Sequence, residues 1–230
     1  MKNMSNTHSQ GRFRIFVGIG FSLSLLLNSM LALNLWNRSV VVAVPDGDTL
    51  QLRDGRRVRL RSIDAPEKDR CMAIEAQNTM EAIALHRHLR LKETMIDSYG
   101  RVLAIAVVED IPGWIGYMTG SFDPLLNRVM VRQGLARYFS SGSNYDNLLS
   151  NESNSAKNLK IGIFSDTCRS VTPRNNCTIK GNLRSNVKTY YLPTCAAYDQ
   201  VIVDESYGDD WFCTEQEATE KGFIKSAHCQ

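Results

Sequence analysis

The sequence predicts an α+β protein in which a five-stranded β-barrel of the OB type carries three helices, with a small cysteine-containing domain after it. Three observations lead to this fold class. Short strand-like runs separated by Asp-Gly turn signals occupy residues 39–63, two further apolar runs lie within 91–108, and a segment of helical periodicity stands between them. Five short strands with a helix between the third and the fourth are the pattern of a small Greek-key barrel.

The first three strands are expected to form an antiparallel meander with very short connections. The pairs Asp46-Gly47 and Asp54-Gly55 are hairpin signals. In the third strand, Val58 and Leu60 face one side and the alternating arginines face the other. The expected strands cover residues 39–44, 49–53, 56–63, 91–95 and 102–108, and the expected helices cover 72–89, 125–135 and 147–159. In the C-terminal domain we expect strands at 188–192 and 200–203 and a helix at 215–221.

The N-terminal segment, residues 1–37, is predicted to target the chain to a membrane. Lys2, Arg12 and Arg14 precede an apolar run, and the first acidic residue is Asp46. Basic residues followed by about 22 largely apolar ones are typical of a signal anchor or a signal peptide, and this length suffices to cross a bilayer. We expect an uncleaved, single-pass anchor in the cell membrane with the rest of the chain on the extracytoplasmic side. A cleaved signal, which would give a secreted protein, and a buried soluble helix are the alternatives.

The overall charge does not by itself indicate a polyanionic partner. The formal net charge is +3 at pH 7, and 22% of the residues are charged while 43% are hydrophobic. These proportions are ordinary for a globular protein. Any nucleic-acid site must therefore arise from a local cluster of charges.

The cysteines favour disulfides in a chain divided into two folded parts. There are 6 cysteines, an even number, and none forms a Cys-x-x-Cys pair of the kind that structural zinc sites use. We place a boundary that separates a barrel domain, 38–169, from a C-terminal domain, 170–230, whose small core makes cross-links plausible. We expect Cys71 to pair with Cys168 and the other four cysteines to pair within the C-terminal domain. Zinc ligation and free buried thiols are the alternatives.

The stretch 44–67 concentrates the side chains that metal-assisted phosphodiester hydrolysis requires. Asp48 begins the second strand and Asp64 ends the third, so a meander brings them to one end of the barrel. Two carboxylates with a carbonyl and waters suit Ca²⁺ better than Zn²⁺, because no His or Cys lies nearby. Glu67 can position or deprotonate a water, and the planar guanidinium of Arg59 can hold two phosphate oxygens.

Three motifs in this chain resemble those of the staphylococcal nuclease, or thermonuclease, family. Taken singly, an Asp before Gly usually shapes a turn, and alternating strand arginines are usually a solvated face. The joint pattern, in order and spacing over residues 39–168, carries the resemblance. The motifs are Asp46-Gly47-Asp48-Thr49 with Arg59-Leu60 and Asp64-Ala65-Pro66-Glu67, then Asp97-Ser98-Tyr99-Gly100-Arg101, then Val131-Arg132-Gln133-Gly134-Leu135-Ala136.

The resemblance implies Ca²⁺-dependent hydrolysis of DNA and RNA at the 5′-oxygen side of the phosphate, and we expect single strands to be preferred. By position it assigns the metal to the carboxylates of Asp48 and Asp64 and the backbone carbonyl of Ala65. It assigns the water to Glu67, and the phosphate to Arg59 and Arg101. It assigns the nucleotide to Tyr99.

The loop 110–124 is longer than in the type enzyme of the family. Tyr117 and Trp114 lie in it, where they can stack on bases or form a hydrophobic cap. We take Tyr117 as a candidate substrate-binding residue. The alternative for the whole chain is a non-catalytic OB-type module that binds nucleic acid or a cell-envelope partner. We expect a monomer.

The C-terminal domain resembles a small module appended to bacterial exported nucleases, sometimes called the sunset domain. The resemblance supplies no function. A structural domain held by disulfides and an adaptor for a surface or for nucleic acid are both open interpretations. The matching stretches include Cys177-Thr178-Ile179-Lys180-Gly181-Asn182 and Trp211-Phe212-Cys213-Thr214-Glu215-Gln216-Glu217-Ala218.

Overall fold

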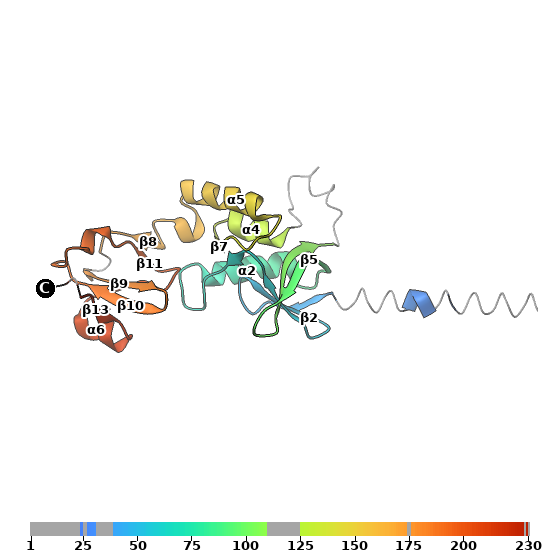
Figure 1. The fold of residues 1–230 in the computed structure, drawn as a ribbon, viewed down its shortest axis with the longest axis horizontal. Helices are drawn as coiled ribbons and strands as arrows, with labels where there is room; N and C mark the ends of the chain where they lie inside the picture. Colours follow the sequence, from blue (N-terminus) through green and yellow to red (C-terminus); the bar gives the residue numbers. More distant parts are fainter. Residues whose placement is uncertain are drawn as a thin grey trace, which may run out of the picture.

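The structure is a computed structural model that describes residues 24, 27–30, 39–109, 125–173, 176–227 and 229. Its elements form two groups that lie side by side along the long axis of the molecule (Figure 1). Most of the predicted anchor and the whole loop that contains Tyr117 lie outside the described residues. Within the described part of the chain, no helix is both long and apolar enough to cross a membrane.

The first group is built on a five-stranded sheet that contains the predicted meander. β1 (Val41–Ala43) pairs antiparallel with β2 (Thr49–Leu52), which pairs antiparallel with β3 (Arg57–Leu60). β6 (Val102–Val108) lies parallel to β3 and antiparallel to β5 (Leu89–Ile96). The strand order is therefore β1-β2-β3-β6-β5.

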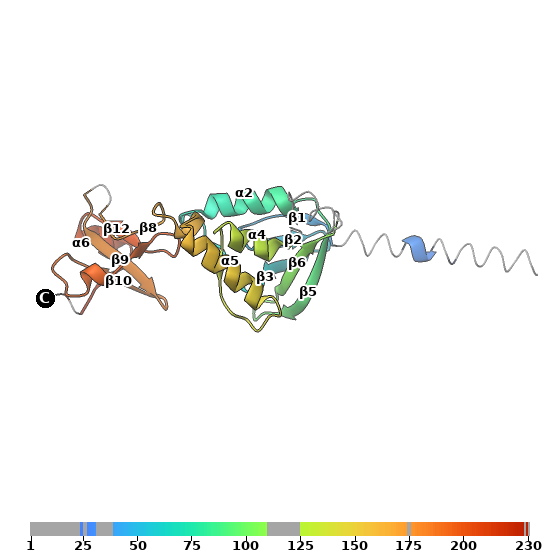
Figure 2. The same ribbon diagram turned by 90° about the horizontal axis from the view of Figure 1, so that it is seen from above.

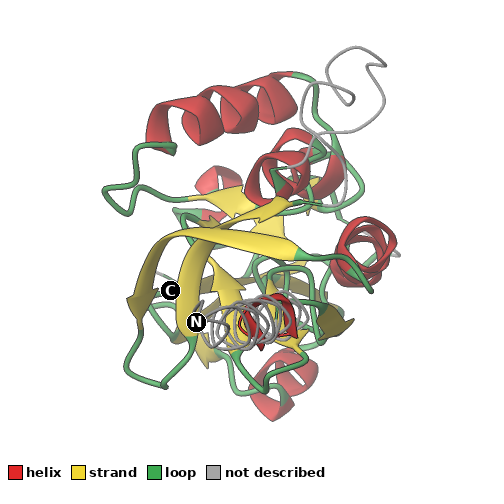
Figure 3. Ribbon diagram, turned by 90° about the vertical axis from the view of Figure 1, so that its right-hand side faces the viewer, coloured by secondary structure: helices red, strands yellow, loops and turns green. Residues whose placement is uncertain are grey.

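This sheet curls around the core but closes only in part (Figure 3). Its outer strands approach each other at an isolated antiparallel bridge between Val40 and His88. The Leu89 N–H donates to the Ser39 carbonyl at 3.0 Å beside this bridge. A further hydrogen bond, from the Val41 N–H to the Arg87 carbonyl at 3.0 Å, lies on the other side of the bridge. The predicted OB-type barrel is therefore present as an open five-stranded order whose edges meet over a short stretch.

The third predicted strand is divided at Ser62, which takes a left-handed backbone conformation with φ 65. β3 ends at Leu60, and a short β4 (Ile63–Asp64) pairs instead with β7 (Arg137–Tyr138). A hydrogen bond of 3.0 Å from the Ser62 hydroxyl to Asp146 holds the break. Asp64 therefore leaves the main sheet and lies opposite Arg137.

Three α-helices complete the first group, as predicted, and Figure 2 shows them gathered on one side of the sheet. They are α2 (Ala73–Ala84), α4 (Leu126–Arg132) and α5 (Asp146–Asn158). α4 packs against β6, α2 and α5. Because Leu89 belongs to β5, the first helix ends earlier than its apolar periodicity suggests. The core includes Leu50, Leu60, Met80, Ile105 and Met130, all fully buried, and each such side chain contributes about 1.5–3 kcal/mol.

The second group is a small four-stranded sheet with one helix and a modest core. The sheet has the order β12-β9-β10-β13. Its core consists of Ile179, Tyr190, Phe212, Ala218 and Phe223. The elements are β9 (Ile179–Arg184), β10 (Val187–Tyr191), β12 (Asp210–Phe212), α6 (Glu215–Glu220) and β13 (Ile224–Lys225). A separate pair, β8 (Arg169–Ser170) and β11 (Val203–Asp204), joins the two groups at the predicted boundary.

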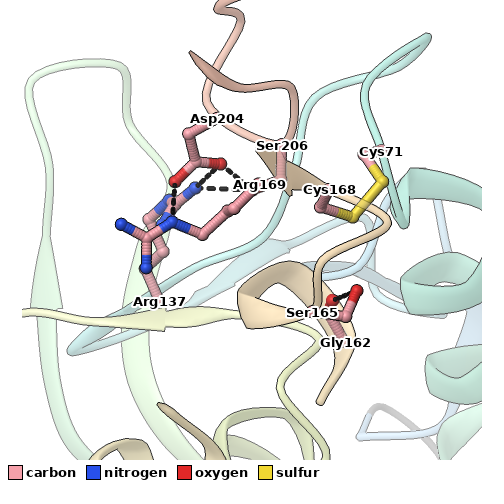
Figure 4. The surroundings of a disulfide bond; sticks show 8 residues. All are labelled: Cys71, Arg137, Gly162, Ser165, Cys168, Arg169, Asp204 and Ser206. Atoms are coloured by element: carbon pink, nitrogen blue, oxygen red, sulfur yellow. Dashed lines mark hydrogen bonds and ion pairs between the residues drawn. A yellow bond between two sulfur atoms is a disulfide. The ribbon is translucent and has the colours of Figure 1, made fainter. Parts of the chain in front are cut away.

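All 6 cysteines are in disulfides, and the predicted partition is confirmed. Cys71 pairs with Cys168 (Figure 4). Cys177 pairs with Cys213, and Cys195 pairs with Cys229, so both remaining bridges lie within the second group. The predicted strand 188–192 and helix 215–221 are also present, whereas 200–203 divides between the 3₁₀ turn η2 (Tyr198–Gln200) and β11.

Candidate active site

Asp48 is held inside the molecule by the turn between β1 and β2. The Asp48 N–H donates to Asp46 Oδ1 at 3.1 Å. Gly47 lies so close to α2 that a Cβ at this position would be 2.7 Å from the Cβ of Ala76, so only glycine fits. Asp46 and Gly47 thus have the turn-forming role predicted for them. The turn leaves Asp48 only 2% exposed.

Arg59 lies between two carboxylates and joins them into one unit. Its Nη1 donates to Asp48 Oδ1 at 2.6 Å, and its Nη2 donates to Asp64 Oδ1 at 2.5 Å. β3 places the arginine on its polar face while the residues on either side enter the core. We call Asp48, Arg59 and Asp64 the acid–arginine cluster. The structure therefore brings together three of the residues that the sequence predicted.

The electrostatics of this cluster are strongly perturbed. Burial raises the pKa of Asp48 to about 7, although the Arg59 charge and the Ala65 N–H act in the opposite direction. Loss of solvation opposes the charged form of Arg59, but Asp48 and Asp64 outweigh it and raise the pKa of the guanidinium. The attraction of Arg59 thus offsets only part of the cost of burying the ionised Asp48 carboxylate. Further positive charge nearby would stabilise the ionised form.

The donor atoms at this point suit a hard cation. Asp48 and Asp64 offer carboxylate oxygens, and Ala65, which follows Asp64 directly, offers a carbonyl. The Ala65 N–H donates to Asp48 Oδ2 at 2.8 Å, which fixes the orientation of that carboxylate. In the described residues no group of three or more His, Cys, Asp and Glu is placed to hold a metal ion. A Ca²⁺ ion here would therefore rely on two carboxylates, a carbonyl and water, a set that Ca²⁺ accepts. The Asp64 side chain is 48% exposed, so the cluster is open to solvent.

Glu67 lies beyond the cluster on the segment that leads from β4 to α2. Its residue is exposed, and its carbonyl accepts the Arg70 N–H at 3.1 Å. The Glu67 carboxylate has no hydrogen-bond or ion-pair partner within the described part of the chain. Cys71, four residues later, is tied to Cys168, so the far end of this segment is anchored. The glutamate is accessible to water but does not belong to the acid–arginine cluster.

Arg101 and Tyr99 lie beside the cluster rather than within it. Arg101 Nε donates to Asp97 Oδ2 at 2.8 Å, and the guanidinium lies 5.3 Å from the centroid of the Tyr99 ring. Leu103 lies opposite Arg59 in the parallel pairing of β3 with β6. Arg101, two residues before Leu103, is thus on the same face at about 6.6 Å along the strand. Residues 99–101 lie beside residues 54–57, but the side-chain contacts of Arg101 are with Asp97 and Tyr99.

Sequence reasoning missed three contributions to this site. The Thr49 hydroxyl donates to Asp48 Oδ1 at 3.1 Å, and the Ala65 N–H also holds Asp48. The pairing of β4 with β7 positions Asp64 opposite Arg137, whose side chain donates to Asp204. The role of Thr49 could have been predicted, because it directly follows Asp48 in the sequence. The position of Arg137 could not, because it depends on a pairing between segments far apart in the sequence.

Comparison with known proteins shows the family to which this chain is similar. The family model "Staphylococcal nuclease homologue" matches residues 57–166. "Protein ParB" of Escherichia coli is 31% identical over 136 residues, which cover 56% of this chain and 73% of that protein. "Micrococcal nuclease" of Shigella flexneri is 29% identical over 136 residues (56% and 74%), and an "Uncharacterized endonuclease" of Escherichia coli is 31% identical over 129 residues (55% and 76%). The chain therefore belongs to the staphylococcal nuclease family.

Proposed function

We propose that the protein is a Ca²⁺-dependent nuclease that hydrolyses DNA and RNA and prefers single strands. The acid–arginine cluster carries this proposal, because it combines oxygen donors for a cation with a guanidinium for phosphate in a solvent-accessible place. Relatives named nuclease and endonuclease support the same chemistry. Contacts with phosphate carry no sequence information, so such a site does not depend on base-specific contacts and accepts both DNA and RNA.

In this proposal Asp48, Asp64 and the Ala65 carbonyl hold the cation. A bound Ca²⁺ would supply positive charge that polarises the phosphate. The buried Asp48 fits this role, because its neighbours leave its ionised form short of compensating charge. Thr49 and the Ala65 N–H keep the two oxygens of Asp48 in fixed directions.

The other residues act on water and phosphate. Glu67 accepts the proton of a water whose oxygen attacks phosphorus, the bond between phosphorus and the 5′ oxygen breaks, and that oxygen takes a proton from solvent. Arg59 exchanges a carboxylate for phosphate oxygens when substrate binds, and Arg101 approaches the phosphate from the neighbouring strand. Tyr99, which is 83% exposed, contacts the adjoining base. Tyr117 lies outside the described residues, and its proposed contact with substrate rests on the sequence alone.

We further propose that the chain is a monomer attached to the cell membrane by residues 1–37, with the nuclease domain 38–169 and the C-terminal domain 170–230 on the extracytoplasmic side. The three disulfides support this location, because such bonds persist in oxidising compartments. Secretion after cleavage of the N-terminal segment is the alternative. A protease-protection assay on intact cells separates an extracytoplasmic domain from an internal one.

A chelator-controlled cleavage assay tests the nuclease proposal. The purified full chain in detergent micelles should cut denatured DNA with Ca²⁺, stop when a chelator is added, and resume when Ca²⁺ is restored. Breakage at the 5′ oxygen predicts products with 5′-hydroxyl and 3′-phosphate ends, which end-labelling detects. Asp64→Ala should lose this activity while remaining folded. Folded wild-type protein that binds DNA without cutting it, with or without chelator, would instead identify the non-catalytic binding module.

A further inference from the structure

A groove lies between two turns of the main sheet, and the residues that line it are distinct from the acid–arginine cluster. It has a volume of about 910 Å³ and is lined by residues 54–57, from the β2–β3 turn, and 99–101, from the β5–β6 turn. We call it the turn groove. A Cβ added at Gly55 or Gly100 would meet nothing within 4 Å, so both turns border open space.

The charges in the turn groove are unequal. Arg56 Nε pairs with Asp54 Oδ2 at 2.7 Å, and Arg101 pairs with Asp97 at 2.8 Å. Arg57 is exposed and has no ion-pair partner in the described part of the chain. Three arginines therefore face two aspartates, and the charge of Arg57 is left without an anion. A phosphate would supply the missing anion, and guanidinium binds phosphate in a planar, two-point geometry.

Arg57 also lies close to Arg59, the residue that is proposed to bind the scissile phosphate. It lies two residues before Arg59 on β3, so both side chains leave the same face of the strand at about 6.6 Å from each other. The parallel pairing of Val58 with Val102 sets Arg57 beside Arg101. Arg57 and Arg101, which line the turn groove, are thus the neighbours of the cluster on β3 and at the start of β6.

The groove also offers an aromatic surface. Tyr99 is 83% exposed, and its ring is held beside the Arg101 guanidinium at 5.3 Å. An accessible ring in the same groove as the Arg57 guanidinium suits a nucleotide, because the base can stack while the phosphate is bound. The combination is less suited to duplex DNA, whose bases are stacked inside and do not reach a side chain at the rim.

We propose that the turn groove is a subsite for the nucleotide adjoining the scissile phosphate, with Arg57 binding the neighbouring phosphate and Tyr99 contacting the base. This inference rests on the proposed nuclease function, and its new element is Arg57, to which the family resemblance assigns no role. Arg57 is then a residue that selects polynucleotides over substrates with a single phosphate. The contact of Tyr99 with the base provides a physical reason for single-strand preference, because the bases of a duplex are stacked inside it.

The test compares Arg57→Ala with wild type on two substrates: a short single-stranded DNA oligonucleotide and a thymidine ester with one phosphate. For the oligonucleotide, KM should rise about tenfold, because one charge-assisted phosphate contact is lost, while kcat changes little. The slope of log KM against log salt should fall by about 0.7, the value for one phosphate contact on a single strand. The preference for oligonucleotide over ester, as a ratio of kcat/KM, should fall in parallel. Arg57→Lys should recover part of the loss.

Arg132→Ala is the matched control, since Arg132 is an exposed arginine at the end of α4, away from the groove. It should leave both substrates and the salt slope unchanged, and thermal unfolding should be the same for both alanine variants. An unchanged salt slope, or equal losses on the two substrates, in Arg57→Ala would overturn the subsite. A wild-type protein that cleaves neither substrate would contradict the nuclease proposal instead.

Discussion

Arg59 is the residue on which both candidate metal ligands depend in the structure. It donates to Asp48 and Asp64 at the same time, and it is the principal counter-charge of a carboxylate that is almost fully buried. A single side chain therefore organises the cluster before substrate arrives. During the proposed reaction it must also turn from carboxylate to phosphate. Its planar shape serves both tasks, because each partner presents two oxygens.

Replacing Arg59 with lysine should separate charge from shape. We expect Arg59→Lys to lower kcat on denatured DNA by about 100-fold or more, because one ammonium group cannot make two parallel hydrogen bonds to phosphate. The melting temperature should change little, since a positive charge still faces the two aspartates. Steady-state kinetics and calorimetry measure the two effects. Turnover near that of wild type would show that Arg59 does not hold the phosphate.

The element that sets the position of Asp64 is the break between β3 and β4. Asp146, the first residue of α5, accepts the Ser62 hydroxyl at this break through Oδ1. Its Oδ2 accepts the Ser140 hydroxyl at 2.9 Å and the Gly142 N–H at 2.9 Å, with further backbone N–H groups nearby. Partial burial opposes ionisation of Asp146, but these hydrogen bonds outweigh it and lower its pKa. One helix terminus thus holds the turn from which β4 departs.

Asp146→Asn should destabilise the fold by about 1–2 kcal/mol at neutral pH, because the amide cannot accept as many hydrogen bonds. The pKa of Asp146 is lower in the folded state, so its contribution is present above the unfolded value of about 3.9 and is lost as pH falls through the folded value. The difference between variant and wild type in urea unfolding should therefore shrink in acid. Asp69→Asn, at an exposed position, serves as control. A difference that stays constant down to acid pH would refute the role of the ionised carboxylate.

At the scale of the whole molecule, a buried aspartate of the C-terminal group joins the two groups of elements. Asp204 lies between Arg137 and Arg169 beside the Cys71–Cys168 disulfide (Figure 4). Arg137 comes from β7, opposite Asp64, and Arg169 directly follows Cys168. Asp204 therefore contacts β7, the strand that pairs with the Asp64 strand, and the residue after Cys168, which is bonded to the segment of Glu67.

Asp204→Asn should lower the free energy of unfolding by about 1–3 kcal/mol, less than for a fully buried pair because both arginines are partly exposed. Removing one partner leaves the two guanidinium groups uncompensated. The double variant Arg137→Gln/Asp204→Asn should therefore lose less than the sum of the single losses. Urea unfolding of the four proteins gives the coupling. Strict additivity would mean that this ion pair does not hold the groups together.

Local patterns predicted much of this molecule. The alternation of Val58, Arg59 and Leu60 gave both the strand and its polar face, because side chains on a strand alternate whatever the partner strand is. Asp-Gly pairs predicted the turns for a similarly local reason. Cross-links in the C-terminal domain were also predictable, since this domain has few apolar residues with which to build a core. Which cysteines pair depends on the fold. Asp48, Arg59 and Asp64 were found from order and spacing.

The residue types of the candidate site and the strand that carries Arg59 follow from the sequence alone, because composition and short-range periodicity are written in it directly. The relative positions of these residues follow only from the folded structure. The break at Ser62, the pairing of Asp64 with Arg137 and the partial closure of the sheet all depend on contacts between distant segments. The same is true of the turn groove, where Arg57 meets Arg101 only because β3 and β6 lie side by side. Such contacts are chosen by the packing of the whole core, which no local pattern records.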